Sequence, residues 1–352
     1  MAEISIRSVS KSYGDTVACK NVSLDVEKGQ LAVLLGPSGA GKTTLLKTIT
    51  GELKPDSGEI HVSGKLVSSP DLMLPPAQRK LGAVMQEGVL WPHMTVEKHL
   101  KLVAEDADKA AELLKLVRLE GLQKRYPDQL SGGEKQRLSL ARSLAAGRKV
   151  LLLDEPLANL DRPLVLELMS DLQRLRKELE LTLLMVTHQQ EDALFLADKM
   201  AIMKEGKIAQ TGTPADIYYE PSDLYVARFF GDNNILPADV FGVDSPPTEN
   251  DDDLPYVVAR PTSLEAKPDG DGIAVKLART VFKGEYWLGE FEHSSGFRAL
   301  VSFTDRPKGD EWKLSLNPPY SVVKAPKVEH SHDDSDHSEL VAGHEHGEIS
   351  FS

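Results

Sequence analysis

The segment GPSGAGKT, residues 36–43, has the residue types and spacing of a phosphate-binding loop. It follows the apolar run Leu31–Leu35 and precedes a helix expected over Lys42–Thr50, which is the strand-loop-helix context that such a loop requires. Its glycines let the backbone wrap a β-phosphate, so that several N–H groups and the helix N-terminus point at the anion. The alternative is a glycine-rich turn that only caps the helix.

The side chains of this loop predict how a nucleoside triphosphate is held. We expect Lys42 to reach the β- and γ-phosphate oxygens and Thr43 to coordinate Mg²⁺. The predicted nucleotide-binding residues of the segment are Gly36, Pro37, Ser38, Gly39, Ala40, Gly41, Lys42, Thr43 and Thr44.

Two adjacent carboxylates, Asp154 and Glu155, close the apolar run VLLLDE. Carboxylates at the C-terminal edge of a parallel sheet face the ligand crevice. Asp154 suits a ligand of Mg²⁺, and Glu155 suits the group that polarises the attacking water. Taken alone, such a run is more often a strand that ends in solvent, and only its pairing with the phosphate loop favours the catalytic interpretation.

The elements that must position these groups follow from the hydrophobic pattern. From Ile4 to about Met203, short apolar runs alternate with helix-period segments, which is typical of a largely parallel α/β sheet. The expected buried strands are Leu31–Leu35, Val150–Leu153 and Leu181–Val186. The expected helices are Lys42–Thr50, Glu97–Gly121 with an interruption near Asp106, Glu134–Ala146 and Pro163–Leu179.

The composition changes after about Pro237. The segment DSPPTENDDDLP, residues 244–255, is acidic and contains proline, so we expect a linker. Short alternating segments separated by Gly, Pro and Asp follow, and they favour a small β-barrel. From about Glu329 the chain is poor in apolar residues and holds five of the ten histidines, so we expect a disordered tail.

The segment LSGGEKQR, residues 130–137, resembles the signature motif of ABC ATPases. From the residues alone, Ser131 followed three positions later by Glu134 is a capping box that starts a helix. The resemblance implies that this helix start, through Ser131, Gly132 and Gly133, closes on the γ-phosphate held by a second subunit. It therefore implies ATP as the nucleotide and a homodimer that encloses two ATP molecules.

The same resemblance assigns roles to four further residues, each of them a weak signal alone. Tyr13 matches the aromatic residue that stacks on adenine, and Asp161, in LANLD, matches the loop that communicates between the two sites. His188 matches the switch histidine that contacts the γ-phosphate. Gln86 matches the glutamine that touches Mg²⁺ and water and links to the membrane subunit. Without the other motifs, Tyr13 and His188 would be structural residues, and Asp161 an N-cap.

These assignments give two functional sets. The implied catalytic residues are Glu155, His188 and Gln86. The implied Mg²⁺ ligands are Thr43, Gln86 and Asp154. Gln189 stands where Asp commonly follows the histidine in the family, a departure that removes no group with direct chemistry.

Within the family, the segments LPPAQRKLGAVMQ and LWPHMTVEKHL resemble the importer branch that serves binding-protein-dependent uptake of sugars, polyamines, sulfate and ferric iron. The segment VVARP resembles the start of that branch's C-terminal OB-like regulatory domain, called TOBE. The implied fold is an α/β P-loop NTPase cassette of the ABC type with a helical subdomain, followed by a small all-β OB-like barrel. The expected division is 1–235 for the ATPase domain, 236–255 for the acidic linker, 256–328 for the TOBE domain and 329–352 for the tail.

Composition constrains location and partners. The net charge of −13 argues against a nucleic-acid partner, and the longest apolar runs are shorter than the roughly 18 residues that span a bilayer. Cys19 is the only cysteine, which favours the cytosol. We therefore expect a peripheral protein on the cytoplasmic face of the cell membrane, working with transmembrane permease subunits and a periplasmic or extracellular substrate-binding protein.

Two other classes compete with this interpretation. A soluble ABC ATPase that moves no cargo usually has two cassettes or a coiled-coil insertion, whereas this chain has one cassette and no sustained heptads. An exporter ATPase usually lacks the C-terminal barrel, so the VVARP region of this chain favours an importer.

The histidine-rich tail is the only sequence feature that bears on cargo. Its composition can bind Zn²⁺, Ni²⁺ or Fe, which tilts the cargo prediction toward ferric iron or another inorganic ion, with a sugar or polyamine left open. The alternative is a solvated acidic tail, because the spacing defines no single coordination geometry. The histidines concerned are His330, His332, His337, His344 and His346.

Overall fold

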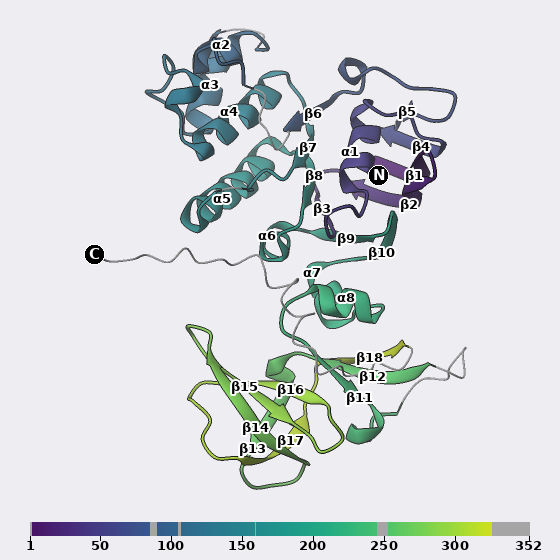
Figure 1. Ribbon diagram of the computed structural model, residues 1–352. Coiled ribbons are helices and arrows are strands. Elements are labelled where there is room, and N and C mark those ends of the chain that lie inside the picture. The colour runs from purple at the N-terminus through teal and green to yellow at the C-terminus, as the bar shows by residue number, and fades with distance from the viewer. Residues whose placement is uncertain (1, 85–89, 105–106, 159, 245–252, 326–352) are drawn as a thin grey trace. The chain divides into compact units, whose positions relative to one another are not determined.

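The computed structural model describes residues 2–84, 90–104, 107–158, 160–244 and 253–325. The chain divides into two compact units, Met1–Ser222 and Asp223–Ser352, which are treated separately below (Figure 1). Among the described residues, none of the helices combines the length and the apolar character needed to cross a membrane.

A six-stranded sheet is the centre of the first unit. Its strand order is β10-β9-β3-β8-β7-β6, and all neighbouring pairs are parallel except β10 with β9. Strands β3, β7 and β8 are buried along their whole length, which explains their unbroken apolar sequences. The strands are β3 (Leu31–Leu35), β6 (Leu81–Val84), β7 (Val150–Asp154), β8 (Thr182–Thr187), β9 (Lys199–Lys204) and β10 (Lys207–Gly212).

A second, antiparallel sheet has the order β2-β1-β4-β5. Its strands alternate buried and exposed residues over much of their length, as expected for a sheet with one covered face. The strands are β1 (Ala2–Tyr13), β2 (Thr16–Glu27), β4 (Ser57–Val62) and β5 (Lys65–Ser68).

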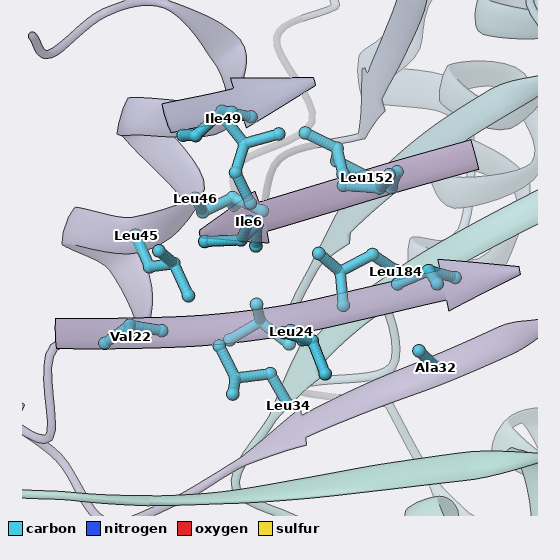
Figure 2. Close-up of a cluster of buried hydrophobic side chains, with 14 of the residues drawn as sticks. Ile6, Val22, Leu24, Ala32, Leu34, Leu45, Leu46, Ile49, Leu152 and Leu184 are labelled. Carbon is cyan, nitrogen blue, oxygen red and sulfur yellow. The ribbon is translucent and has the colours of Figure 1, made fainter. Parts of the chain in front are cut away.

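One hydrophobic core joins helix α1, Lys42–Thr50, to both sheets (Figure 2). Leu45, Leu46 and Ile49 of the helix are fully buried in this core. Burying each such side chain is worth about 1.5–3 kcal/mol, so the core fixes the helix on which the phosphate loop ends. Its strand members labelled in Figure 2 are Ile6, Val22, Leu24, Ala32, Leu34, Leu152 and Leu184.

The other face of the parallel sheet carries a group of helices. Successive side chains of a strand point to opposite faces, and Leu153 of β7 lies with Leu168 and Leu172 of helix α5 rather than with the α1 core. Figure 1 likewise shows α4 and α1 on opposite sides of β6–β8. The remaining helices of the unit are α2 (Val96–Lys101), α3 (Ala107–Leu116), α4 (Gly132–Ala145), α5 (Arg162–Leu179), α6 (Gln190–Leu196) and α7 (Pro214–Tyr219), with 3-10 turns η1 (Pro76–Gln78) and η2 (Pro127–Gln129).

The second unit is an antiparallel β structure, in two sheets of order β11-β12-β18 and β13-β17-β14-β15-β16 that form a nearly closed barrel. Phe291 and Trp312, with ring centroids 5.7 Å apart, pack in its core. The elements are α8 (Leu224–Phe229), β11 (Asn234–Pro237), η3 (Asp239–Phe241), β12 (Leu254–Ala259), η4 (Pro261–Ser263), β13 (Leu264–Lys267), β14 (Ile273–Phe282), β15 (Trp287–Glu292), β16 (Arg298–Phe303), β17 (Glu311–Leu316) and β18 (Tyr320–Ala325).

The predicted fold class, an α/β cassette followed by a small β-barrel, is confirmed. The interrupted helix expected over Glu97–Gly121 is two helices, α2 and α3, and the helix expected over Glu134–Ala146 is α4, which starts two residues earlier, directly after the predicted Ser131 cap. The two compact units divide after Ser222, so α8 and β11 group with the barrel, although the sequence placed residues up to 235 in the ATPase domain. The four-part division itself stays a prediction, and the histidine tail lies outside the described residues.

Candidate functional site

The phosphate loop links the end of β3 to the start of α1, and its neighbours leave no room for side chains at two positions. A Cβ on Gly36 would lie 2.3 Å from the Met203 carbonyl oxygen, and one on Gly41 would lie 2.1 Å from the Ala18 carbonyl oxygen. Gly41 is the N-cap of α1 and has φ of 101°, a backbone conformation that residues with a Cβ rarely adopt. Glycine is therefore required at both positions by packing alone.

Lys42, the first residue of α1, points back into the loop. Its Nζ donates to the carbonyl oxygens of Gly36 at 2.6 Å and of Pro37 at 2.9 Å, and the residue is only 8% exposed. Burial lowers the pKa of Lys42, while the charges of Glu155 and Asp154 act in the opposite direction. The loop thus encloses a cation close to two carboxylates.

Asp154 and Glu155 stand at the end of β7, on the same sheet edge where β3 and β8 end. Asp154 is 7% exposed, and burial, followed by the charge of Glu155, raises its pKa. Lys42 opposes this rise. A buried carboxyl with a raised pKa is electrostatically suited to a divalent cation, because the cation would supply the compensating charge that Lys42 provides only in part.

Glu155 is held in a strained conformation. Its φ is 47°, in the left-handed region that residues with a Cβ seldom adopt, and its N–H donates to the Val186 carbonyl of β8 at 2.9 Å. Such strain concentrates at functional sites, where the surrounding structure maintains it. The turn aims the carboxylate across the sheet edge toward the end of β8.

His188 meets Glu155 at that edge. Its Nδ1 lies 2.9 Å from Glu155 Oε1, and its Nε2 lies 3.1 Å from Nε2 of Gln189. An amide nitrogen only donates, and an imidazole ring whose Nε2 accepts that bond can donate from Nδ1 to Glu155. The predicted catalytic pair is therefore in direct contact, and Gln189, the departure from the family pattern, supports it.

The signature segment starts helix α4 as predicted. Ser131 is the N-cap, its hydroxyl accepts the Glu134 N–H at 3.3 Å, and the Glu134 carboxylate accepts the Ser131 N–H at 2.7 Å. A Cβ on Gly132 would lie 2.8 Å from Leu160, and one on Gly133 2.8 Å from Leu164. A side chain at either position would have to displace a leucine methyl group of the segment before or within α5, so packing adds a preference for glycine that no motif indicates.

The other predicted residues fall in different surroundings. Tyr13 ends β1 with 49% of its surface exposed, and Thr43 is exposed at the start of α1. Asp161 precedes α5 as its N-cap residue, but within the described chain its side chain makes no capping hydrogen bond. Gln86 lies outside the described residues, so its two assigned roles stay predictions.

Arg79 is a supporting residue that the sequence did not reveal. Its side chain is 1% exposed, and it donates to the carbonyls of Thr48 at 3.0 Å and Ile49 at 2.9 Å in the last turn of α1, and to Leu74 O at 2.7 Å. A cation at a helix C-terminus satisfies free carbonyls and complements the helix dipole. The only available signal was an arginine in LPPAQRKLG just before a strand.

The fold and these motifs define an ABC cassette, a phosphate-loop ATPase. The family model described as ABC transporter matches residues 19–158. The sulfate/thiosulfate import ATP-binding protein of Thermosynechococcus vestitus is 39% identical over 332 residues, covering 92% of this chain and 96% of that protein. The spermidine/putrescine import ATP-binding protein of Clostridioides difficile is 37% identical over 337 residues, covering 90% and 95%.

A solved relative agrees with this class. A bacterial ABC transporter cassette determined in a dimeric structure is 30% identical with a TM-score of 0.53, and the match covers 60% of this chain and 98% of that cassette. The chain belongs to the ATP-binding proteins of ABC transporters, in the binding-protein-dependent importer branch, and is an ATP-hydrolysing transport ATPase. The predicted family and enzyme class are confirmed.

Asp154→Asn is expected to raise the free energy of unfolding of the nucleotide-free chain at pH 7. Because burial raises the pKa of Asp154, the folded chain binds that proton more tightly than the unfolded chain, so ionisation costs stability above the unfolded-state pKa of about 3.9. The gain should shrink as pH falls and vanish below about pH 4. Urea unfolding over this pH range measures it; a variant less stable than the parent at pH 7 would contradict the account.

Proposed function

We propose that ATP binds with its triphosphate in residues 36–44 and its adenine on Tyr13. Three observations support this: the two glycines packed against backbone, the buried ammonium of Lys42, and the α1 N-terminus at the loop. On binding, Lys42 exchanges the carbonyls of Gly36 and Pro37 for phosphate oxygens, which are stronger acceptors because they are charged.

Mg²⁺ fits the donors at this edge. The exposed Thr43 hydroxyl and the buried Asp154 carboxylate are hard oxygen ligands of the kind that Mg²⁺ prefers, with Gln86 as the third proposed ligand. When bound, the ion would neutralise charge that develops on the phosphate oxygens. The raised pKa of Asp154 supports the assignment, since a cation would favour its ionised form.

Hydrolysis is assigned to Glu155 with His188. The observation that carries this role is the 2.9 Å contact between Glu155 Oε1 and His188 Nδ1 at the edge where Lys42 lies. Glu155 orients and polarises the attacking water. His188 fixes the carboxylate and contacts the γ-phosphate.

The functional unit is a head-to-tail homodimer. Helices α1 and α4 lie on opposite sides of strands β6–β8, so the signature of one chain is remote from the helix that carries its own phosphate loop (Figure 1). Ser131, Gly132 and Gly133 are therefore assigned to the ATP of the second copy, with Asp161 as the link between the sites. ATP closes this dimer and hydrolysis reopens it.

The dimer lies on the cytoplasmic face of the membrane and drives a separate permease. A substrate-binding protein delivers the substrate to that permease. The names of the relatives, both import ATP-binding proteins, support an importer over an exporter or a soluble ATPase. The segment around Gln86, outside the described residues, is the proposed contact with the permease.

The cargo that the relatives favour is a charged small solute, with a sugar left open. One relative is named for sulfate and thiosulfate and another for spermidine and putrescine. The inorganic-ion prediction, with ferric iron as its example, rests on the tail histidines, which lie outside the described residues.

Glu155→Gln should retain ATP binding, accumulate a closed dimer and hydrolyse ATP at a rate lower by orders of magnitude, because the water loses its base while the phosphate contacts remain. Size-exclusion chromatography with and without ATP, and steady-state phosphate release, measure the two effects. Glu178→Gln, an exposed carboxylate at the far end of α5, is the matched control. Near-normal turnover of Glu155→Gln would remove Glu155 from the role.

Affinity purification from native membranes in mild detergent should recover a polytopic permease and a binding protein with this chain. Mass spectrometry identifies both, and the recovered binding protein can be screened against metals, sulfate, polyamines and sugars. Recovery of ribosomal or DNA-associated proteins alone would contradict the transporter role and support a soluble ATPase.

Truncation after Lys327 tests the cargo argument. If the tail histidines serve a metal-ion cargo, the truncated chain loses its affinity for Zn²⁺, Ni²⁺ or Fe³⁺ in calorimetry while its ATPase rate stays unchanged, since the site residues precede the cut. Unchanged metal affinity would end the argument from the tail.

A further inference from the structure

Asp56 lies in the loop between α1 and β4 and binds the end of β1, the strand next to β4 in the sheet (Figure 1). Its Oδ1 lies 2.7 Å from Nζ of Lys11, and its Oδ2 accepts the Ser12 N–H at 2.7 Å. Its own N–H donates to the Ser10 carbonyl at 2.9 Å. One residue thus holds three consecutive residues of β1.

The neighbouring packing fixes this loop against β1. Ser57 pairs with Ser10 across the two strands. Gly58 has φ of 82°, and a Cβ there would lie 2.4 Å from the carbonyl oxygens of Arg7 and Ser8, so only glycine allows β4 to approach this closely. The position of Asp56 is therefore set by backbone contacts on both sides.

The residue that follows the held segment is Tyr13. Its side chain is half exposed, so packing holds the ring only in part, and its backbone continues directly from Ser12 at the end of β1. After a turn the chain returns as β2 and passes the phosphate loop, where Ala18 crowds Gly41 and Cys19 Sγ lies 3.6 Å from the Gly41 carbonyl oxygen. The end of β1 is therefore connected to the phosphate loop through β2.

The Asp56 carboxylate stays ionised in the neutral pH range. The hydrogen bond from Lys11, followed by the Ser12 N–H, lowers the pKa of its carboxyl. Both contacts therefore persist until the pH falls through that lowered pKa, well below physiological values.

We propose that Asp56 is a positioning residue for the nucleobase: by holding Lys11 and Ser12 it presents the Tyr13 ring for stacking on adenine. The inference rests on the proposed function, in which Tyr13 stacks on the base. Because Asp56 follows α1, it also connects the helix that receives the phosphates to the strand that receives the base. Preorganising an aromatic platform spares the ordering cost that binding would otherwise carry.

The test compares ADP with inorganic pyrophosphate, both with Mg²⁺, by calorimetry on the full chain. Neither ligand is hydrolysed at the site, and only ADP has a base. Asp56→Ala should weaken ADP binding by up to about tenfold, the upper end of what stacking on an aromatic ring contributes, and leave pyrophosphate binding unchanged. Tyr13→Ala should do the same. The double variant should bind ADP no more weakly than Tyr13→Ala, because Asp56 acts through Tyr13.

Two further variants separate positioning from general damage. Glu59→Gln removes a carboxylate of similar side-chain exposure, 49% against 47% for Asp56, from the same strand region and should leave both affinities unchanged. Lys11→Met removes one of the two side-chain contacts and should weaken ADP less than Asp56→Ala. Thermal unfolding of each variant shows whether it is folded.

The other possible results of this calorimetry each overturn one part of the proposal. Equal weakening of ADP and pyrophosphate by Asp56→Ala, or additive losses in the double variant, would make Asp56 a structural residue. If Asp56→Ala binds ADP normally while Tyr13→Ala binds ADP weakly, the positioning role is overturned and the proposed adenine site stands. Normal ADP binding by Tyr13→Ala would overturn the proposed adenine site itself.

Discussion

Two backbone carbonyls, those of Met203 and Ala18, press against the phosphate loop so closely that no side chain fits at Gly36 or Gly41. These contacts constrain the loop, and α1 starts directly after it at Lys42, with the free N–H groups of its first turn facing the loop. Strands β9 and β2 supply those carbonyls, so both sheets and the core around α1 contribute to one anion site.

The sheet edge beside this loop combines charges that a stable core would avoid. Asp154 and Lys42 are both mostly buried. Burial raises the pKa of Asp154 and lowers the pKa of Lys42, so it favours the neutral form of each. Glu155 adds a strained backbone at the same place. The buried strands β3, β7 and β8 hold these groups in place through their packing, which is how strain persists at functional sites.

Local motifs predicted the phosphate loop, the carboxylates that end β7 and the capped start of α4, because each depends on residues adjacent in sequence. The contacts of Asp56 with β1 and of Arg79 with the end of α1 were not predictable, since they join segments about 30 to 45 residues apart. The helix-period pattern begins only at Glu134, two residues late, because Gly132 and Gly133 have no side chains to contribute to it, whereas the capping box of Ser131 and Glu134 indicates the observed start. The grouping of β11 with the barrel depends on its pairing with β12, which no local pattern encodes.

The packing of Gly132 on Leu160 and of Gly133 on Leu164 has a consequence for how this family is read through evolution. A glycine at either signature position could be credited wholly to nucleotide contact, yet here a leucine methyl group also lies in the space that a side chain would take. The two constraints are separable by covariation. In relatives with a smaller residue at 160 or 164 the packing constraint is relieved, so a glycine that persists beside it would report the requirement of the ligand alone.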